Sequence, residues 1–312
     1  MLGGTLGAPI LIRRVGHVKA FPAFVTLAVV ATMLLPLRVE PAVWVALRAA
    51  TGFAFAGIFA VTESWINARA RNADRGRIYA VYQLVNFVAG TLGQWSLGAL
   101  QIGGAAAFLA GGALIAASVV PLLASHAQSP PAPRSIRPRP LWIARLAPVS
   151  AFASLVAGIA NGSVWALGPL YAVGIGVPAT DVPAFTSAII VGSAAGVFPA
   201  GLLSDRIDRR LAPAFEMGVG AVAEFALSML HAPGAAMIVL GFMVGATTFT
   251  CYTISMSHAA DRARGQEFVA VSTSMLAIYC FGAISGPALG SMAMRCSDRP
   301  RFSPKTQRLT PP

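Results

Sequence analysis

Charged residues are scarce in this sequence. Asp, Glu, Lys and Arg together make up 11% of its 312 residues, whereas a soluble globular domain carries about a quarter. Cysteine is rarer still, and three residues without paired spacing do not form a disulfide scaffold. Apolar side chains supply 56% of the chain, and the mean hydropathy is +0.70. This composition excludes a water-soluble globule and a disordered chain, and it predicts an integral membrane protein.

Motifs for catalysis and for ATP binding are also missing. The sequence contains neither a glycine-rich P-loop nor an H-E-x-x-H zinc motif. No nucleophile–base pair or metal-ligand cluster can be recognised. The four histidines are scattered over the predicted loops: His17, His126, His231 and His258. We therefore expect neither an enzyme nor an ATP-driven pump, and no cofactor or metal.

Long apolar stretches indicate an all-α membrane protein, because a spanning helix needs about 20 mainly apolar residues. Nine stretches have this length. A tenth, Met1–Ile12, is only about half as long and lacks the flanking sequences of a signal peptide. We expect about nine full spans and one partial span. The full spans are predicted at residues 21–37, 42–62, 78–100, 103–124, 147–171, 182–203, 211–230, 235–256 and 268–294.

Basic residues alternate between the predicted loops. One set of loops holds nearly all the loop arginines, whereas the opposite loops hold Arg38 alone. Cytoplasmic loops carry the excess of Lys and Arg, so the basic loops are predicted to be cytoplasmic in a multi-pass protein of the inner (plasma) membrane. The net charge of +12 is then a topology signal rather than a sign of nucleic-acid binding. Only the basic tail after Met294, predicted outside, violates the rule.

Composition divides the chain into two helical bundles. Residues 126–146 hold five prolines and four arginines, which indicates a cytoplasmic linker. The bundles are predicted at residues 1–125 and 147–294, followed by an atypical polar tail at 295–312. Gly90 and Gly98 lie 192 residues before Gly282 and Gly290, and other segments match at nearly the same offset. This indicates a duplicated unit.

The repeat also predicts helices that the sequence does not contain. At the same offset, the span from Ala147 would have its partner before Met1, and the span 103–124 would have its partner after 294. We expect a six-plus-six protein that is truncated at both ends, with the first bundle lacking its first helix. A natural ten-helix variant is the alternative.

A charged loop follows the predicted span 182–203. The segment Gly201-Leu-Leu-Ser-Asp205-Arg-Ile-Asp-Arg-Arg210 resembles the signature loop of the major facilitator superfamily (MFS). The resemblance implies a gating latch, in which a helix-end carboxylate pairs with arginines in one state; a plain positive-inside loop is the alternative. The candidate residues are Gly201, Asp205, Arg206, Asp208, Arg209 and Arg210, with Arg13, Arg14 and Gly16 in the first-half copy.

Two further segments narrow this resemblance. Leu47-Arg48-Ala-Ala-Thr-Gly52 is similar to the superfamily's fourth-helix pattern with an intramembrane arginine; snorkelling of Arg48 to the outer interface is the alternative. Glu63-Ser-Trp-Ile-Asn67, followed by Asp74-Arg-Gly-Arg77, looks like the YcaD-like branch. The resemblance covers residues 1–294 and implies a two-bundle, twelve-helix inner-membrane permease.

Polar side chains inside the predicted spans are the remaining candidates for a solute path, since such groups must face protein or water. Glu224 lies mid-span and could titrate if buried. Interhelical hydrogen bonding is the alternative role for the uncharged groups. The candidate cavity-lining residues are Gln83, Asn86, Gln94, Asn161, Trp165 and Tyr171, and the candidate helix-packing residues are Gly282, Gly286, Pro287 and Gly290.

These features predict a secondary transporter that moves a small solute by alternating access, including the case of proton-coupled efflux. The expected partners are the lipid bilayer and a small-molecule substrate with a coupling proton; no nucleic acid is expected, and the protein should be a monomer. The alternative function is a non-functional fragment that retains membrane insertion only.

Overall fold

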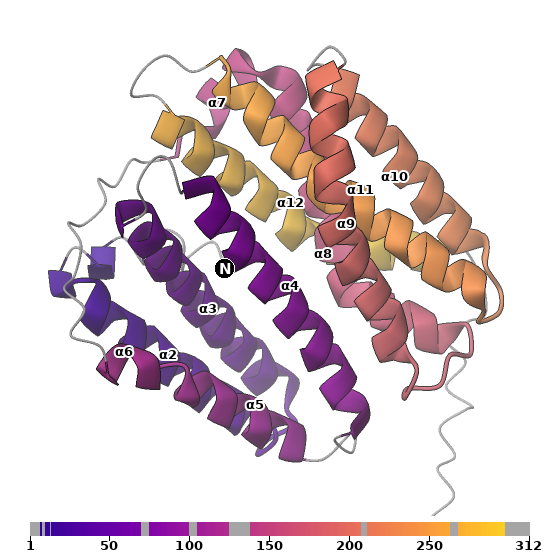
Figure 1. Ribbon diagram of the computed structural model, residues 1–312. Coiled ribbons are helices and arrows are strands. Elements are labelled where there is room, and N and C mark those ends of the chain that lie inside the picture. The colour runs from indigo at the N-terminus through magenta and orange to yellow at the C-terminus, as the bar shows by residue number, and fades with distance from the viewer. Residues whose placement is uncertain are drawn as a thin grey trace, which may run out of the picture. The chain divides into compact units, whose positions relative to one another are not determined.

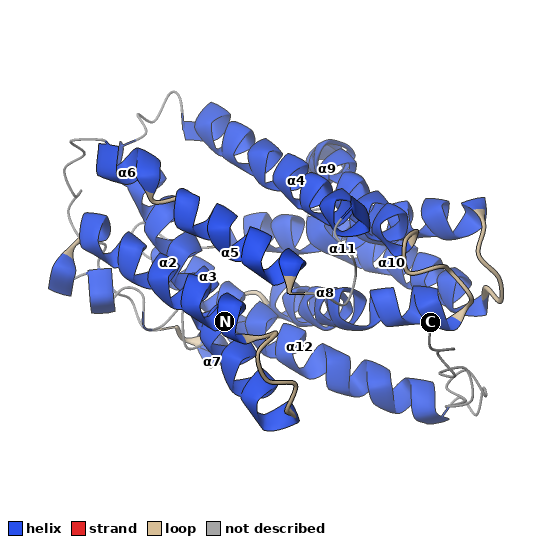
Figure 2. Ribbon diagram, turned by 90° about the horizontal axis from the view of Figure 1, so that it is seen from below, coloured by secondary structure: helices blue, strands red, loops and turns tan. Residues whose placement is uncertain are grey.

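The computed structural model describes residues 7, 10–12, 14–69, 75–99, 105–124, 138–206, 211–262 and 268–296. Within these ranges all regular structure is α-helical (Figures 1 and 2). The helices are α2 (His17–Leu34), α3 (Pro41–Arg69), α4 (Arg75–Ala99), α5 (Ala106–Ala117), α6 (Val120–Ala124), α7 (Pro140–Leu146), α8 (Pro148–Gly174), α9 (Val182–Arg206), α10 (Leu211–Met229), α11 (Ala235–Ala260) and α12 (Phe268–Cys296).

Seven of the described helices are long and apolar enough to cross a membrane: α2, α3, α8, α9, α10, α11 and α12. Two predicted spans are not among them. The sequence of α4 includes the polar residues Gln83, Asn86 and Gln94, which lower its hydropathy. The span predicted at 103–124 is divided by a turn at Ser118–Val119 between α5 and α6. The number of nine spans stays a prediction.

The helices cluster into two compact units. The first contains residues 1–89 and 96–136, and the second contains residues 90–95 and 137–312. Residues 140–146, which the sequence analysis placed in the linker, form the short helix α7. Its Ile143 is fully buried beside Ala259 and Met275. The linker at 126–146 stays a prediction, and its local prolines and arginines gave no sign of the helix at 140–146.

The first unit is built on the pair α2 and α3. Phe24 packs against Phe53 with ring centroids 5.9 Å apart, and a Cβ atom at Gly57 would lie 2.4 Å from the Phe24 ring. The absence of a side chain at Gly57 therefore makes room for the aromatic ring. Helix α5 packs on α2, with Gly112 directly beside Met33.

The second unit is built on two close helix pairs. A Cβ atom at Gly158 on α8 would lie 2.2 Å from the carbonyl oxygen of Tyr279, and one at Gly286 on α12 would lie 2.3 Å from that of Ile159. Between α9 and α11, a Cβ atom at Gly192 would lie 2.0 Å from the carbonyl oxygen of Phe242. Small residues let membrane helices approach until their backbones touch. Helix α10 lies outside these pairs and packs mainly on α11.

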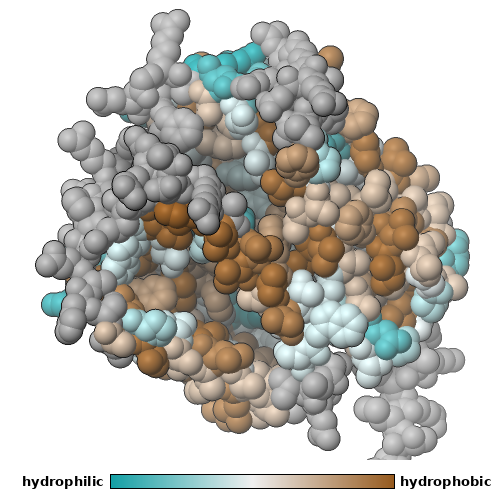
Figure 3. Space-filling view, viewed as in Figure 1, coloured by the Kyte–Doolittle hydropathy of each residue, from teal (hydrophilic) through white to brown (hydrophobic). Residues whose placement is uncertain are grey.

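The outer surfaces of the helices are strongly apolar, as the brown areas of Figure 3 show. Val222 and Phe225 on α10 are 70% and 66% exposed, and Leu84 and Val85 on α4 are each 60% exposed. Exposed side chains of this kind suit contact with lipid chains rather than water.

Candidate functional site

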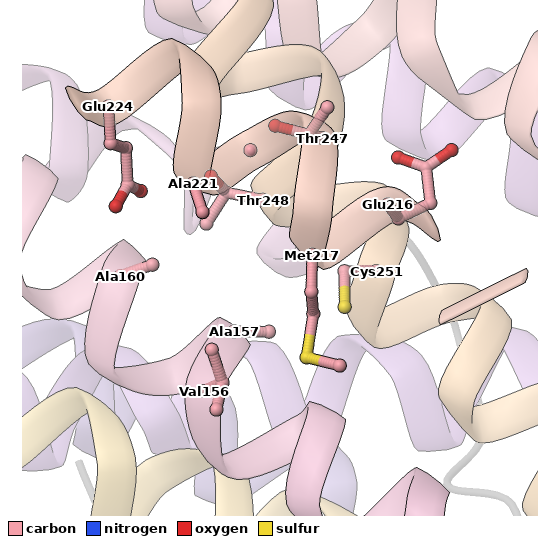
Figure 4. A pocket seen from close by; sticks show the side chains of 11 residues that line it. Val156, Ala157, Ala160, Glu216, Met217, Ala221, Glu224, Thr247, Thr248 and Cys251 are labelled. Atoms are coloured by element: carbon pink, nitrogen blue, oxygen red, sulfur yellow. The ribbon is translucent and has the colours of Figure 1, made fainter. Parts of the chain in front are cut away.

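A small cavity of about 70 Å³ lies inside the second unit, between α8, α10 and α11 (Figure 4). Helix α10 contributes both of its carboxylates, Glu216 and Glu224. Helix α8 contributes only apolar or small side chains, such as Val156 and Ala160. In Figure 4 the Glu224 side chain extends from α10 into the space in front of Ala160. The cavity thus combines two acids with an apolar wall.

The spacing of four residues along α10 explains this arrangement. Glu216, Gly220 and Glu224 follow one another at i, i+4 and i+8, so they share one helical face. A Cβ atom at Gly220 would lie 3.0 Å from the hydroxyl oxygen of Thr247 on α11. Glycine at this position therefore holds α10 close to α11, with one carboxylate on each side of the contact.

Glu216 is the more deeply buried acid, with 8% of its surface exposed. The hydroxyl of Thr250, itself 1% exposed, donates a hydrogen bond to Glu216 Oε2 over 3.1 Å. The same hydroxyl oxygen lies 2.6 Å from the carbonyl oxygen of Ala246 and 3.1 Å from that of Thr247. A hydroxyl has one hydrogen to donate, so three acceptors compete for it.

The other polar groups of the cavity face it as acceptors. The hydroxyls of Thr247 and Thr248 donate within α11, to the carbonyl oxygens of Met243 at 2.9 Å and Val244 at 2.7 Å. Their oxygens can then only accept from a cavity occupant. The buried thiol of Cys251, which is not part of a disulfide and lies 4.0 Å from the carbonyl oxygens of Ala153 and Pro213, completes the α11 side of the cavity.

A second, larger cavity of about 190 Å³ shares Glu224 with the first. Helices α8, α9, α10, α11 and α12 all line it, mostly with apolar side chains, including the rings of Tyr171 and Phe185. The Tyr171 hydroxyl donates to the carbonyl oxygen of Leu227, which ties α8 to α10 at the edge of this cavity. Among the described residues that line it, Glu224 is the single charged one.

The residues predicted from sequence to line a cavity have different environments. Of the α8 set, Tyr171 lines the larger cavity, and Trp165 is 41% exposed. Asn161 is 3% exposed, and its Nδ2 has no hydrogen-bond partner among the described residues. On α4, Gln83 is exposed and Asn86 donates to the carbonyl oxygen of Tyr82 over 2.9 Å.

Gln94 belongs to the second unit, where its Oε1 accepts a hydrogen bond from Thr186 over 3.0 Å. The glycines predicted to mediate helix packing lie along α12 against α8. A Cβ atom at Gly282 would lie 2.3 Å from the Leu155 carbonyl oxygen, and one at Gly290 would lie 2.7 Å from the Leu167 side chain. Pro287 is inside α12 between these contacts.

The charged candidates are placed only in part. Arg48 is exposed, in the second turn of α3. Arg14 is exposed as well, and Gly16 precedes α2 with a φ of 77°, a left-handed conformation that favours glycine. The backbone of Gly201, Asp205 and Arg206 forms the last turns of α9. Asp208, Arg209, Arg210 and Arg13 lie outside the described residues.

Glu216, Thr250 and Cys251 line or border the smaller cavity but were not predicted from the sequence as site residues. Glu216 lies only six residues into its span, where an acid reads as a helix-end group. The available signal was its spacing of two helical turns from Glu224, which placed both acids on one face. Thr250 gave no signal, because its pairing with Glu216 joins positions on two different helices.

Two transporters of known structure have a similar fold. A bacterial homologue of the human lysosomal transporter Spinster, in an inward-facing and occupied conformation, has a TM-score of 0.77 and 14% identity over 93% of this chain and 70% of its own. The Escherichia coli fucose:proton symporter FucP has a TM-score of 0.58 and 13% identity, covering 96% of this chain and 82% of its own.

Sequence comparison gives the family. An MFS-type transporter of Yersinia pestis (strain Pestoides F) is 28% identical, covering 96% of this chain and 78% of its own length. The MFS-type transporter YcaD of Escherichia coli O45:K1 is 26% identical, covering 94% and 76%. The sequence profile of the Major Facilitator Superfamily matches residues 1–287. Seven helices in the described part of the chain are long and apolar enough to cross a membrane, and this chain is a multi-pass membrane protein that belongs to the Major Facilitator Superfamily of transporters, not to an enzyme family.

Proposed function

We propose that the protein is a secondary transporter that moves a small solute by alternating access and couples the movement to protonation of Glu216 and Glu224. The observation that carries the proposal is this pair of acids in one cavity within spanning helices. Ionisable groups inside a membrane are costly and are found where a solute or a proton passes. The hydroxyl of Thr250 can serve both charge states, since it donates to a carboxylate and accepts from a carboxylic acid.

The topology, the oligomeric state and the cytoplasmic latch are proposed as the sequence predicts them. About nine spans cross the inner membrane with the basic loops and the linker in the cytoplasm, and the protein acts as a monomer. Asp205, at the end of α9, forms a latch with neighbouring arginines that closes the cytoplasmic side in one state. Family membership and the helix-end position of Asp205 support the latch.

Distance measurement between the two units tests this proposal without knowledge of the solute. Spin labels at Leu37→Cys and His231→Cys, both exposed next to the ends of α2 and α10, would be introduced after replacement of the native cysteines. We expect two distance populations whose ratio changes between about pH 8 and about pH 5.5. Glu216→Gln, which resembles the protonated acid, should hold the low-pH ratio at both values.

Two further variants sharpen the comparison. Asp205→Asn should shift the ratio toward the state with an open cytoplasmic side, because the latch loses its carboxylate. Asp181→Asn, an exposed acid in the same unit, should keep the native response. If the spin-label distance has a single value that changes neither with pH nor with the Glu216→Gln substitution, alternating access is contradicted. The result would then favour a fragment that only inserts into the membrane.

A further inference from the structure

We propose that the larger cavity of the second unit binds a hydrophobic organic cation, with its onium group against Glu224 and its apolar body among α8, α9 and α12. Transport of such a cation rests on the proposed function, whereas its binding is argued from the cavity alone. The cavity of about 190 Å³ is lined mostly by apolar side chains and carries one carboxylate.

The charge of the occupant follows from Glu224. This half-buried carboxylate has no hydrogen bond or ion pair with any of the described residues, and none of those lining the larger cavity is basic. The smaller cavity, which Glu224 also lines, contains Glu216 and the hydroxyl oxygens of Thr247 and Thr248, whose hydrogens are used within α11. An uncompensated acid among acceptors selects a positively charged partner or a strong donor.

The apolar lining decides between a metal ion and an organic cation. Hard metal ions require several oxygen ligands, and the described part of the chain has no group of three acidic, histidine or cysteine side chains that could hold one. The partly exposed ring of Tyr171 instead offers an aromatic surface of the kind that binds ammonium groups by cation–π attraction. An apolar cavity of about 150 Å³ is large enough for a benzene ring, so one aromatic ring with a small onium group suits this site.

Benzyltrimethylammonium is a suitable probe, and neopentylbenzene is its neutral isostere. Binding of both would be measured by calorimetry on the full chain in lipid nanodiscs. We expect the cation to bind and the neutral isostere to bind at least about tenfold more weakly. Glu224→Gln should weaken binding of the cation about tenfold and leave that of the isostere unchanged. Ser228→Phe, which places a ring among the lining residues, should weaken both.

Asp181→Asn is the matched control, because it removes an exposed acid of the same unit and should bind the cation like the native chain. Unchanged thermal unfolding of Glu224→Gln would show that the variant folds. Equal affinity of native chain and Glu224→Gln for the cation, or equal affinity of the native chain for both probes, would overturn the inference. Binding without uptake of the radiolabelled cation into proteoliposomes would support the site and count against the proposed transport function.

Discussion

At the scale of single residues, the function depends on ionisable side chains whose burial in a membrane costs free energy. Glu224 could be singled out from the sequence because it lies in the middle of an apolar span. Glu216 could not, since its environment depends on Thr250 on a different helix. Hydropathy reports how apolar a segment is, but it does not report which helix covers which face.

Thr250 should stabilise the buried acid. Thr250→Val removes the only donor that the structure gives to Glu216 among the described residues, with little change of volume. We expect the free energy of unfolding to fall by about 1–3 kcal/mol, because the carboxylate is left buried without its hydrogen bond. Unfolding would be followed by circular dichroism in mixed micelles. Thr250→Ser should restore most of the stability.

Thr253→Val provides the control for that experiment. Thr253 is exposed on the same helix, and its hydroxyl only reaches the carbonyl oxygen of Phe249 at 3.4 Å. Its replacement should change stability by less than about 0.5 kcal/mol. If both valine variants lower the free energy of unfolding equally, the hydrogen bond to Glu216 does not stabilise the protein.

At the scale of helices, glycine spacing was informative in advance and helix partners were not. The glycines at 282, 286 and 290 predicted a packing face, and α8 is the helix that lies against it. The packing of α7 on α11 and α12 could not be predicted from the sequence, because Ile143 is buried by residues that are distant along the chain. Local patterns encode the faces of a helix, whereas tertiary contacts decide the pairing.

The contact between α8 and α12 should not tolerate a methyl group. In Gly286→Ala the new Cβ atom would lie 2.3 Å from the Ile159 carbonyl oxygen, so two helix backbones must move apart. We expect a loss of about 1–3 kcal/mol in the free energy of unfolding, measured by denaturation in increasing SDS. Gly218→Ala, where a Cβ atom meets nothing within 4 Å, should be neutral or slightly stabilising. Equal effects would show that the close approach is unimportant.

At the scale of the whole molecule, composition predicted an integral membrane protein, because it is averaged over the entire chain. The family was predicted from the resemblance of short segments such as Gly201–Arg210. Family membership extends over residues 1–287. The side of each loop is a separate matter, since helix geometry is the same in either orientation. Sidedness therefore rests on the distribution of arginines.

Cysteine labelling tests that orientation. In a background without the native cysteines, Leu37→Cys and His231→Cys should react with a membrane-impermeant maleimide added to intact cells. Lys19→Cys, also exposed, should react only after the membrane is opened, because its loop is predicted to be cytoplasmic. The reverse pattern would show that the basic loops face outward.

The competition for the Thr250 hydrogen has a mechanical consequence. Threonine hydroxyls that bond to carbonyls one turn earlier bend a helix, and α11 carries such bonds at Thr247, Thr248 and Thr250. The Thr250 hydroxyl lies within hydrogen-bond distance of both the Ala246 carbonyl and Glu216, so its one hydrogen can serve the backbone or the acid. Helix α11 therefore has three points at which a threonine hydroxyl shares a backbone carbonyl, and the Thr250 hydrogen is the one for which Glu216 is a further acceptor.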